Sequence, residues 1–201
     1  MPHLPLNIDM HDRIALVAGG GQVACRKVKA LLASGACVRV VTPVMVPEIS
    51  DLATSGAIAL YKRRYQPGDL DNCFLAVAAT DDAEANRRVA ADARQRGTLV
   101  AVADAPELGT CTFPAVLRRG DLEIGVSTGG RCPAFALLVR DLLAGMIGDG
   151  YGVALEQVAS EREKLLTEGN DSTYNSQLVR TIAQRLIAEL SAKTEQNVPE
   201  N

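Results

Sequence analysis

The sequence predicts an α/β protein: an N-terminal parallel sheet covered by helices, then a small α+β unit and a C-terminal helical segment. Short apolar runs alternate with helical patterns over the first half of the chain, which is the rhythm of βα units. Near residue 110 this rhythm stops, and two strand-like runs followed by helical patterns replace it. We therefore expect divisions at residues 1–109, 110–148 and 149–201.

The composition indicates a core of small aliphatic side chains and excludes several classes of partner. Apolar residues make up 47% of the 201 residues and aromatic residues 3%, with no Trp. The net charge of −3, with Lys and Arg scattered along the chain, provides no basic surface for nucleic acid. No apolar run approaches the ~20 residues that span a membrane. We expect a cytosolic protein that binds neither nucleic acid nor membrane.

Cysteine and histidine are too few and too scattered to form a familiar metal site. The two histidines, His3 and His11, both lie near the N-terminus, which argues against a His-rich metal centre and against a Ser-His-Asp triad. No Cys-x-x-Cys pair occurs, so we expect the first four cysteines to be small buried hydrophobic residues: Cys25, Cys37, Cys73 and Cys111. We predict no resident metal, and chemistry that depends on carboxylates, a cofactor, or both.

A glycine-rich turn follows the first apolar run. Residues 14–18 predict a buried strand, and the helical pattern after the turn ends at Gly35. The turn reads Gly19-x-Gly21-x-x-Ala24, a variant of the dinucleotide fingerprint. Gly19 allows the sharp turn, and Gly21 lets a pyrophosphate approach the backbone at the helix N-terminus. This pattern predicts a Rossmann-like dinucleotide site, and the alternative is a glycine turn that only packs.

Four further strands are expected in the first half of the chain, at residues 37–41, 57–61, 73–79 and 99–103. A doubly wound sheet of this kind has the strand order 3-2-1-4-5 and binds its ligand across the carboxyl ends of strands 1 and 4. The adenosine half of a dinucleotide then lies over strand 2, and the nicotinamide half lies towards strands 4 and 5.

The cofactor-binding residues are therefore expected in the glycine turn and at the ends of the second and fourth strands. No Asp or Glu follows the second strand, where NAD-specific folds carry one for the ribose, and no Arg stands there for a 2′-phosphate. We favour NAD, with Thr42 or the backbone beside it as the ribose contact. The predicted set is Gly19, Gly20, Gly21, Gln22, Val23, Thr42, Pro43, Val44 and Thr80.

Acidic residues follow the fourth and fifth strands. Asp104 comes directly after the fifth strand, which makes it the carboxylate best placed beside a nicotinamide; the alternative is an Asx residue that starts a turn. Asp81 and Glu84 form a capping-box-like pair for the helix that runs to Arg96, and contact with the cofactor is the other interpretation.

The second part of the chain begins with two strand-like runs, 110–118 and 122–128, joined by a turn at 119–121. Hydroxyls, glycines and a cation then precede a proline-started helix, a pattern that indicates an anion-binding junction or simply a well-capped helix start. This junction comprises Ser127, Thr128, Gly129, Gly130 and Arg131.

The helix expected at residues 134–147 is apolar around most of its surface. One face carries Phe135, Leu138, Val139, Leu142, Leu143 and Met146. A surface helix has a broader polar face, so we expect burial against a second copy and predict a homodimer formed through residues 110–147. Two amphipathic helices follow at 151–168 and 176–193, joined at 169–171.

Several short motifs run in register over residues 4–145. They are Leu4-Pro5, Gly19-Gly-Gly-Gln-Val-Ala24-x-Arg26-Lys27, Ala78-Ala-Thr-Asp-Asp82 with Asn86, Val102-Ala-Asp104-Ala-Pro106, Phe113-Pro114 and Val126-Ser-Thr-Gly-Gly130-x-x-Pro133. Together they resemble the precorrin-2 dehydrogenases of sirohaem synthesis, a family that also supplies the N-terminal half of fused sirohaem synthases. Cys132 stands where that family usually has serine, either as a neutral replacement or as a thiol that delivers metal.

The resemblance implies oxidation of precorrin-2 to sirohydrochlorin with NAD as hydride acceptor. It implies that Asp104 is the catalytic carboxylate and that the junction at 127–131 contacts the carboxylates of the tetrapyrrole. Some relatives also insert ferrous ion into sirohydrochlorin, so a ferrochelatase activity stays open. The competing hypothesis is a non-catalytic, dimeric module that senses a dinucleotide.

Overall fold

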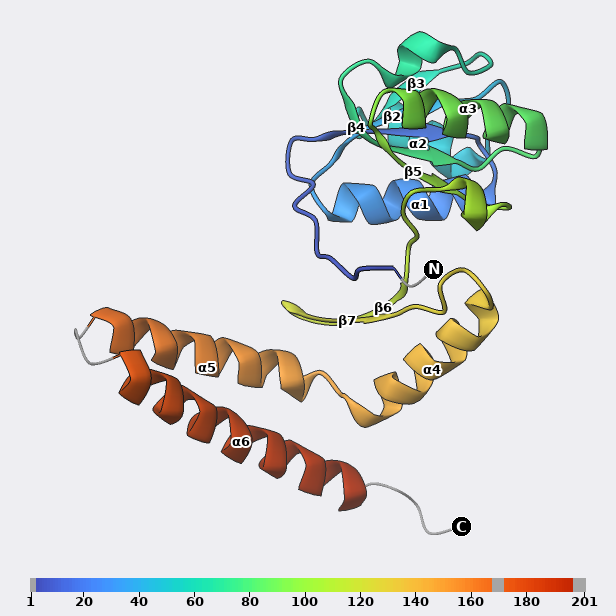
Figure 1. Ribbon diagram of the computed structural model, residues 1–201. Coiled ribbons are helices and arrows are strands. Elements are labelled where there is room, and N and C mark those ends of the chain that lie inside the picture. The colour runs from blue at the N-terminus through green and yellow to red at the C-terminus, as the bar shows by residue number, and fades with distance from the viewer. Residues whose placement is uncertain (1–2, 168–171, 197–201) are drawn as a thin grey trace. The chain divides into compact units, whose positions relative to one another are not determined.

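The computed structural model describes residues 3–167 and 172–196 and divides into two units, Met1–Phe113 and Pro114–Asn201 (Figure 1). Each unit has its own packing and is described by itself. The expected connection at 169–171 lies outside the described residues. The three-part division expected from the sequence stays a prediction.

The first unit is a five-stranded, all-parallel sheet of order β3-β2-β1-β4-β5, which confirms the predicted α/β class and strand order. Its strands are β1 Ile14–Ala18, β2 Cys37–Val41, β3 Ala59–Tyr61, β4 Cys73–Ala78 and β5 Leu99–Val102. Its helices are α1 Gln22–Ala33, α2 Pro47–Thr54 and α3 Ala83–Gln95, with two short 3₁₀ turns, η1 Pro67–Leu70 and η2 Pro106–Leu108.

Helices cover both faces of this sheet, and Figure 1 shows α1 and α3 on opposite sides of it. Alternate residues of β1 face opposite ways: Val17 packs in a cluster with Val28 of α1, and Leu16 packs in another with Val89 of α3. All four side chains have no exposed surface. The near-continuous apolar runs seen in the sequence are therefore strands that are buried on both sides.

Residues 110–114 are not the strand that the sequence suggested, because β6 begins only at Ala115. The N–H groups of Thr110 and Cys111 both donate to the carbonyl of Val100 in β5, at 2.8 and 3.2 Å. Thr110 Oγ1 in turn accepts from the N–H of Val100 at 2.9 Å. This segment is thus bonded to the edge of the first sheet, and Pro114 has no N–H with which to extend a ladder.

The expectation of four buried cysteines is largely wrong. Cys25 is buried in α1, whereas Cys73 and Cys111 are half-buried and Cys37 is exposed. Cys37 is the first residue of β2, where the sheet meets solvent. Its position at a strand end, rather than its residue type, decides its exposure.

The second unit begins with an antiparallel hairpin of β6 Ala115–Arg119 and β7 Leu122–Val126. Three helices follow: α4 Pro133–Met146, α5 Gly150–Thr167 and α6 Ser172–Gln196. Figure 1 shows α5 and α6 side by side. The stripe expected on the last helix is confirmed, because Leu178, Ile182, Leu186 and Leu190 are each half-buried. Within the described ranges, no helix is long and apolar enough to cross a membrane.

One side chain ties the hairpin to the end of α4. Arg119 donates from Nε to the carbonyl of Ile147 at 2.8 Å and from Nη2 to the carbonyl of Ala144 at 3.2 Å. These carbonyls end the helix and have no N–H partner within it, so a guanidinium satisfies them and suits the negative end of the helix dipole. The hairpin and α4 therefore form one packed element.

Candidate functional site at the carboxyl edge of the sheet

In the glycine turn after β1, backbone atoms of other segments pack closely against the first two glycines, and the third glycine faces open space. Gly19 has φ +131°, and a Cβ there would lie 2.2 Å from the carbonyl oxygen of Ala79. A Cβ on Gly20 would lie 2.1 Å from the carbonyl oxygen of Val44. A Cβ on Gly21 would meet no atom within 4 Å. The first two glycines are thus required by the fold, and the third faces the space that a ligand needs.

The N-terminus of α1 provides the chemistry of an anion site. Gly21 is the N-cap and has no side chain to cover the first N–H groups, and no acid stands in the first turn. These N–H groups have no acceptor within the helix and lie at the positive end of its dipole. Gln22 and Val23 are exposed beside them. A dinucleotide pyrophosphate fits this arrangement.

Thr42 at the end of β2 supports the turn and does not offer its hydroxyl to a ligand. Its side chain is 4% exposed, and Oγ1 donates to the carbonyl of Val44 at 2.6 Å. The N–H of Val46 donates to the carbonyl of Gly20 at 2.8 Å, so this loop and the glycine turn hold each other. The other expected candidates for the ribose contact, Pro43 and Val44, are exposed, and their contact with a ribose stays a prediction.

Thr80 at the end of β4 is joined to a buried asparagine of α3. The N–H of Thr80 donates to Asn86 Oδ1 at 3.1 Å, and the Thr80 hydroxyl lies 2.7 Å from the same oxygen. Asn86 Nδ2 donates back to the carbonyl of Thr80 at 3.1 Å. Asn86 is 1% exposed, and this amide fixes the chain at the end of β4.

Asp104 lies on the same edge, directly beyond β5. The sheet ladder continues to Ala103, whose N–H donates to the carbonyl of Ala78 at 2.9 Å. Asp104 is exposed, and its Oδ1 accepts from Asn86 Nδ2 at 2.9 Å. The acid is therefore connected through Asn86 and Thr80 to the strand end that packs against Gly19. The structure brings the predicted acid and the predicted glycine turn to one edge of one sheet.

The cap of α3 is Asp82 rather than Asp81. Asp82 Oδ1 accepts from the N–H groups of Glu84 and Ala85, at 2.9 and 3.1 Å. The capping-box interpretation of the neighbouring pair, Asp81 with Glu84, is wrong by one residue. Asp82 has extended backbone angles, and its side chain accepts from the second and third N–H groups of the helix, which is the usual geometry of an N-cap.

The junction at 127–131 belongs to the second unit and folds as a glycine turn before α4. Gly129 and Gly130 have φ values of +62° and +80°. The N–H of Gly129 donates to Ser127 Oγ, and the N–H of Cys132 donates to Thr128 Oγ1, both at 3.2 Å. The two hydroxyls thus stabilise the turn, while Ser127 and Arg131 are exposed. Cys132 is exposed at the N-cap of α4.

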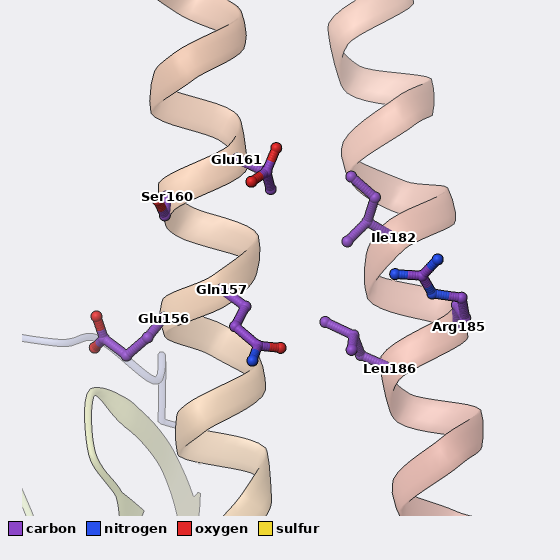
Figure 2. Close-up of a pocket in the computed structure, with 7 residues that line it drawn as sticks. All are labelled: Glu156, Gln157, Ser160, Glu161, Ile182, Arg185 and Leu186. Atoms are coloured by element: carbon purple, nitrogen blue, oxygen red, sulfur yellow. The ribbon is translucent and has the colours of Figure 1, made fainter.

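A pocket lies between α5 and α6, also within the second unit. Figure 2 shows Gln157 and Glu161 of α5 pointing towards Ile182 and Leu186 of α6. Its lining mixes acids, one arginine and aliphatic residues, and it includes none of the site residues predicted from the sequence.

The sequence did not predict that Asn86 is part of this site. Asn86 belongs to one of the sequence motifs, but an asparagine inside a helix has many uses, so the motif alone does not indicate its contact with Asp104. Its spacing of six residues from Thr80, across a helix start, was the available signal. Gly20 was predicted as a cofactor-binding residue, but its close approach to the loop after β2 was not, because that contact depends on packing between segments far apart in sequence.

Comparison with known proteins supports a dinucleotide-binding fold. Residues 6–115 match the protein family described as "Putative NAD(P)-binding". Similar curated proteins include the siroheme synthase of Chromobacterium violaceum, 45% identical over 152 residues, and that of Pseudomonas entomophila, 41% identical over 165 residues. These alignments cover 76% and 82% of this chain but only 32% and 36% of the relatives' own lengths.

Among solved structures, "SirC, precorrin-2 dehydrogenase" has a TM-score of 0.79 and 24% sequence identity. The match covers 96% of this chain and 100% of that one, so the two share a fold along their lengths.

Proposed function

The chain belongs to the putative NAD(P)-binding family, and we propose that it is an NAD-dependent dehydrogenase that oxidises precorrin-2 to sirohydrochlorin in sirohaem synthesis. The observation that carries this proposal is the exposed carboxylate of Asp104, held through Asn86 and Thr80 on the same sheet edge as the glycine turn. Relatives named siroheme synthase and a fold shared with a precorrin-2 dehydrogenase support it.

The first unit has the parts that this reaction needs. Its α1 N–H groups and the open space at Gly21 would hold the pyrophosphate of NAD. When bound, NAD supplies the acceptor for the hydride that leaves the substrate. Loss of a hydride leaves a cationic macrocycle that must also lose a proton. The carboxylate of Asp104 stabilises that positive charge and accepts the proton, which then passes to solvent.

The exposed side chains at the junction support a role in binding substrate. Precorrin-2 has a rim of carboxylates, and the junction offers Ser127 and the guanidinium of Arg131 at the start of α4. Positive-φ glycines keep Cβ atoms away from this turn, which favours close approach of an anion to its backbone. The proposed contacts are Ser127, Thr128, Gly129, Gly130 and Arg131.

A homodimer is part of this proposal. On α4, Val139 and Leu143 are half-buried, whereas the residues one turn apart on another face are largely exposed. Phe135 is 58% exposed, Leu138 68%, Leu142 66% and Met146 56%. An apolar stripe of this length on a helix is typical of an interface, and a second copy offers a stripe of the same chemistry.

We propose a cytosolic location, supported by five cysteines that are all free. Iron insertion would be a second activity of the same carboxylate. Entry of a metal into sirohydrochlorin releases protons, and Asp104 is a base that could take them. Adding ferrous ion to sirohydrochlorin and the purified chain, and following the sirohaem spectrum, tests this activity independently of the oxidation.

The test of the proposed function is anaerobic turnover. Purified chain is mixed with precorrin-2 and either NAD or NADP, and the appearance of sirohydrochlorin and of reduced nicotinamide is followed by absorbance. We expect both products in equal amounts, faster with NAD. Absence of both products under saturating conditions would refute the dehydrogenase.

A dinucleotide sensor without catalysis is the alternative, and binding separates the two. A sensor binds NAD at α1 but has no use for a tetrapyrrole. Calorimetry with NAD and with sirohydrochlorin therefore distinguishes them: the dehydrogenase binds both, whereas a sensor binds the dinucleotide alone.

A further inference from the structure

We propose that Asn86 is a positioning residue that holds the carboxylate of Asp104 for proton transfer. This inference rests on the proposed dehydrogenase function. It starts from a contrast in burial: Asp104 is exposed, whereas the amide that contacts it is 1% exposed on α3. An exposed aspartate side chain is free to rotate unless another group fixes it, and a buried amide is itself fixed by its hydrogen bonds.

Both ends of the Asn86 amide are hydrogen-bonded. Oδ1 has the Thr80 N–H at 3.1 Å and the Thr80 hydroxyl at 2.7 Å. Nδ2 donates one hydrogen to the carbonyl of Thr80 at 3.1 Å and the other to Asp104 Oδ1 at 2.9 Å. Both hydrogens of Nδ2 are therefore bonded, and Oδ1 accepts from the Thr80 N–H. The single hydrogen of the Thr80 hydroxyl can reach either Oδ1 or the carbonyl of Asp82, which lies 2.9 Å away.

The backbone of Thr80 determines which way the amide points. A peptide N–H can only donate and a peptide carbonyl can only accept, so Oδ1 must face the former and Nδ2 the latter. A flipped amide would put two donors together and two acceptors together. The remaining N–H is therefore directed at Asp104, where it fixes the direction of one carboxylate oxygen.

The same peptide forms the wall of the glycine turn. The carbonyl oxygen of Ala79, directly before Thr80, would lie only 2.2 Å from a Cβ added at Gly19. One buried amide therefore connects the carboxylate to the segment against which the cofactor turn packs. A small error in the position of a catalytic group costs up to about 100-fold in rate. We expect loss of the Asn86 contact to lower kcat by about 10- to 100-fold.

The test compares Asn86→Ala, Asp104→Ala and the double variant in anaerobic precorrin-2 oxidation, with NAD and substrate saturating. Asn86→Ala should lower kcat, while in the Asp104→Ala background it should change kcat by less than about twofold, since the carboxylate it positions is gone. Thr98→Ala is the matched control. Thr98 is 7% exposed, and its hydroxyl donates to the carbonyl of Cys73 at 3.3 Å. This control should lose stability but keep kcat.

Thermal unfolding and NAD titration accompany each variant, and Asn86→Ser serves if Asn86→Ala does not fold. Serine removes the amide that donates to Asp104 but keeps a small polar side chain at this position of α3. Unchanged kcat with weaker NAD binding would overturn the inference and leave Asn86 as a support for Thr80 alone. Equal fold-losses from Asn86→Ala in both backgrounds would overturn it too. If the wild-type chain forms no sirohydrochlorin, the proposed function fails, and the inference fails with it.

Discussion

The two units of this protein bury their apolar residues to very different extents. In the first unit, Leu16 and Val28 lie between sheet and helix with no exposed surface. In the second unit, Leu138 and Leu142 of α4 are 68% and 66% exposed, although the sequence of α4 is more apolar than that of α1, which carries Val28. The first unit completes its own core, whereas the second has apolar surface that one chain leaves uncovered.

This difference teaches where function and assembly are expected. The first unit is closed enough to hold polar groups in fixed positions, as the buried amide of Asn86 illustrates, since both of its hydrogens are bonded. In the second unit, Arg119 and Thr128 make hydrogen bonds at the two ends of α4, whereas Leu138 and Leu142 in the middle of that helix are exposed. We therefore expect substitutions in the first unit to affect folding and chemistry, and substitutions on the α4 stripe to affect association.

The most severe break is expected at the glycine turn. Gly19→Ala puts a Cβ 2.2 Å from a backbone carbonyl at φ +131°, so we expect a loss of more than about 3 kcal/mol or no folded protein. Urea unfolding measures it. Gly21→Ala is the control, because its Cβ meets nothing within 4 Å. That variant should unfold like the wild type but bind NAD more weakly; equal losses of stability in both variants would contradict the account.

A matched pair of leucines tests the contrast in burial directly. Leu16→Ala should lower the free energy of unfolding by about 3 kcal/mol, because it leaves a cavity in a closed core. Leu138→Ala removes the same atoms from an exposed site and should cost less than about 0.5 kcal/mol in the monomer. Similar losses at the two sites, measured at a concentration where the chain is monomeric, would show that the units do not differ in this way.

An ion pair between the buried carboxylate of Asp69 and the half-buried guanidinium of Arg63 makes the first unit sensitive to acid. Asp69 accepts from Nη1 and Nη2 of Arg63, at 2.8 and 2.6 Å, and from the N–H of Gln66 at 2.8 Å. Burial alone raises the pKa of Asp69, but the Arg63 and Gln66 hydrogen bonds outweigh it and hold this pKa below the ordinary carboxyl value.

A carboxyl whose pKa is depressed in the folded state stabilises the protein at any pH above its pKa in the unfolded chain, about 3.9. This stabilisation is lost as the pH falls through the pKa of the folded state. We expect Asp69→Asn to cost about 2 kcal/mol at pH 7 and progressively less below about pH 4. Urea unfolding at several pH values measures the difference. A difference that stays constant down to pH 2 would contradict this role.

The smallest effect on the folded chain is expected from a charge on the α4 stripe. Leu142→Glu should change the unfolding free energy of the monomer by less than about 0.5 kcal/mol, because the side chain is exposed. It should nevertheless dissociate a dimer, since two buried charges would face each other across a symmetric interface. Light scattering after size exclusion reports the mass. A wild-type monomer, or a dimeric Leu142→Glu variant, would contradict the proposed interface.

Strands in the first unit could be predicted closely because local signals bound them. β1 and β2 match their expected limits, since the apolar run of β1 ends at the glycine turn at Gly19 and the largely apolar run of β2 ends at Thr42-Pro43. The glycine fingerprint likewise depends on local spacing. The start of β6 was predicted too early, because Thr110 and Cys111 bond to β5, and that choice of partner has no local pattern.

The remaining parts of the site depend on contacts between distant segments. The bond from Asn86 to Asp104 joins residues 18 apart and exists only because α3 docks beside β5. Thr42 is a predicted ribose ligand, but its hydroxyl donates a hydrogen bond to the carbonyl of Val44, a contact that the sequence pattern does not indicate. The sequence of α4 shows that the helix is apolar, but only packing against the hairpin reveals which face stays uncovered.

The most direct test of the central claim is the rate of precorrin-2 oxidation by Asp104→Asn at saturating NAD. This substitution keeps the size of the side chain and an oxygen that can accept from Asn86, but removes the group that takes the proton. General-base catalysis contributes about 10²- to 10⁴-fold, so we predict a fall in kcat of at least about 100-fold with NAD binding unchanged. A kcat within about threefold of the wild-type value would contradict the assignment of Asp104 and the site built around it.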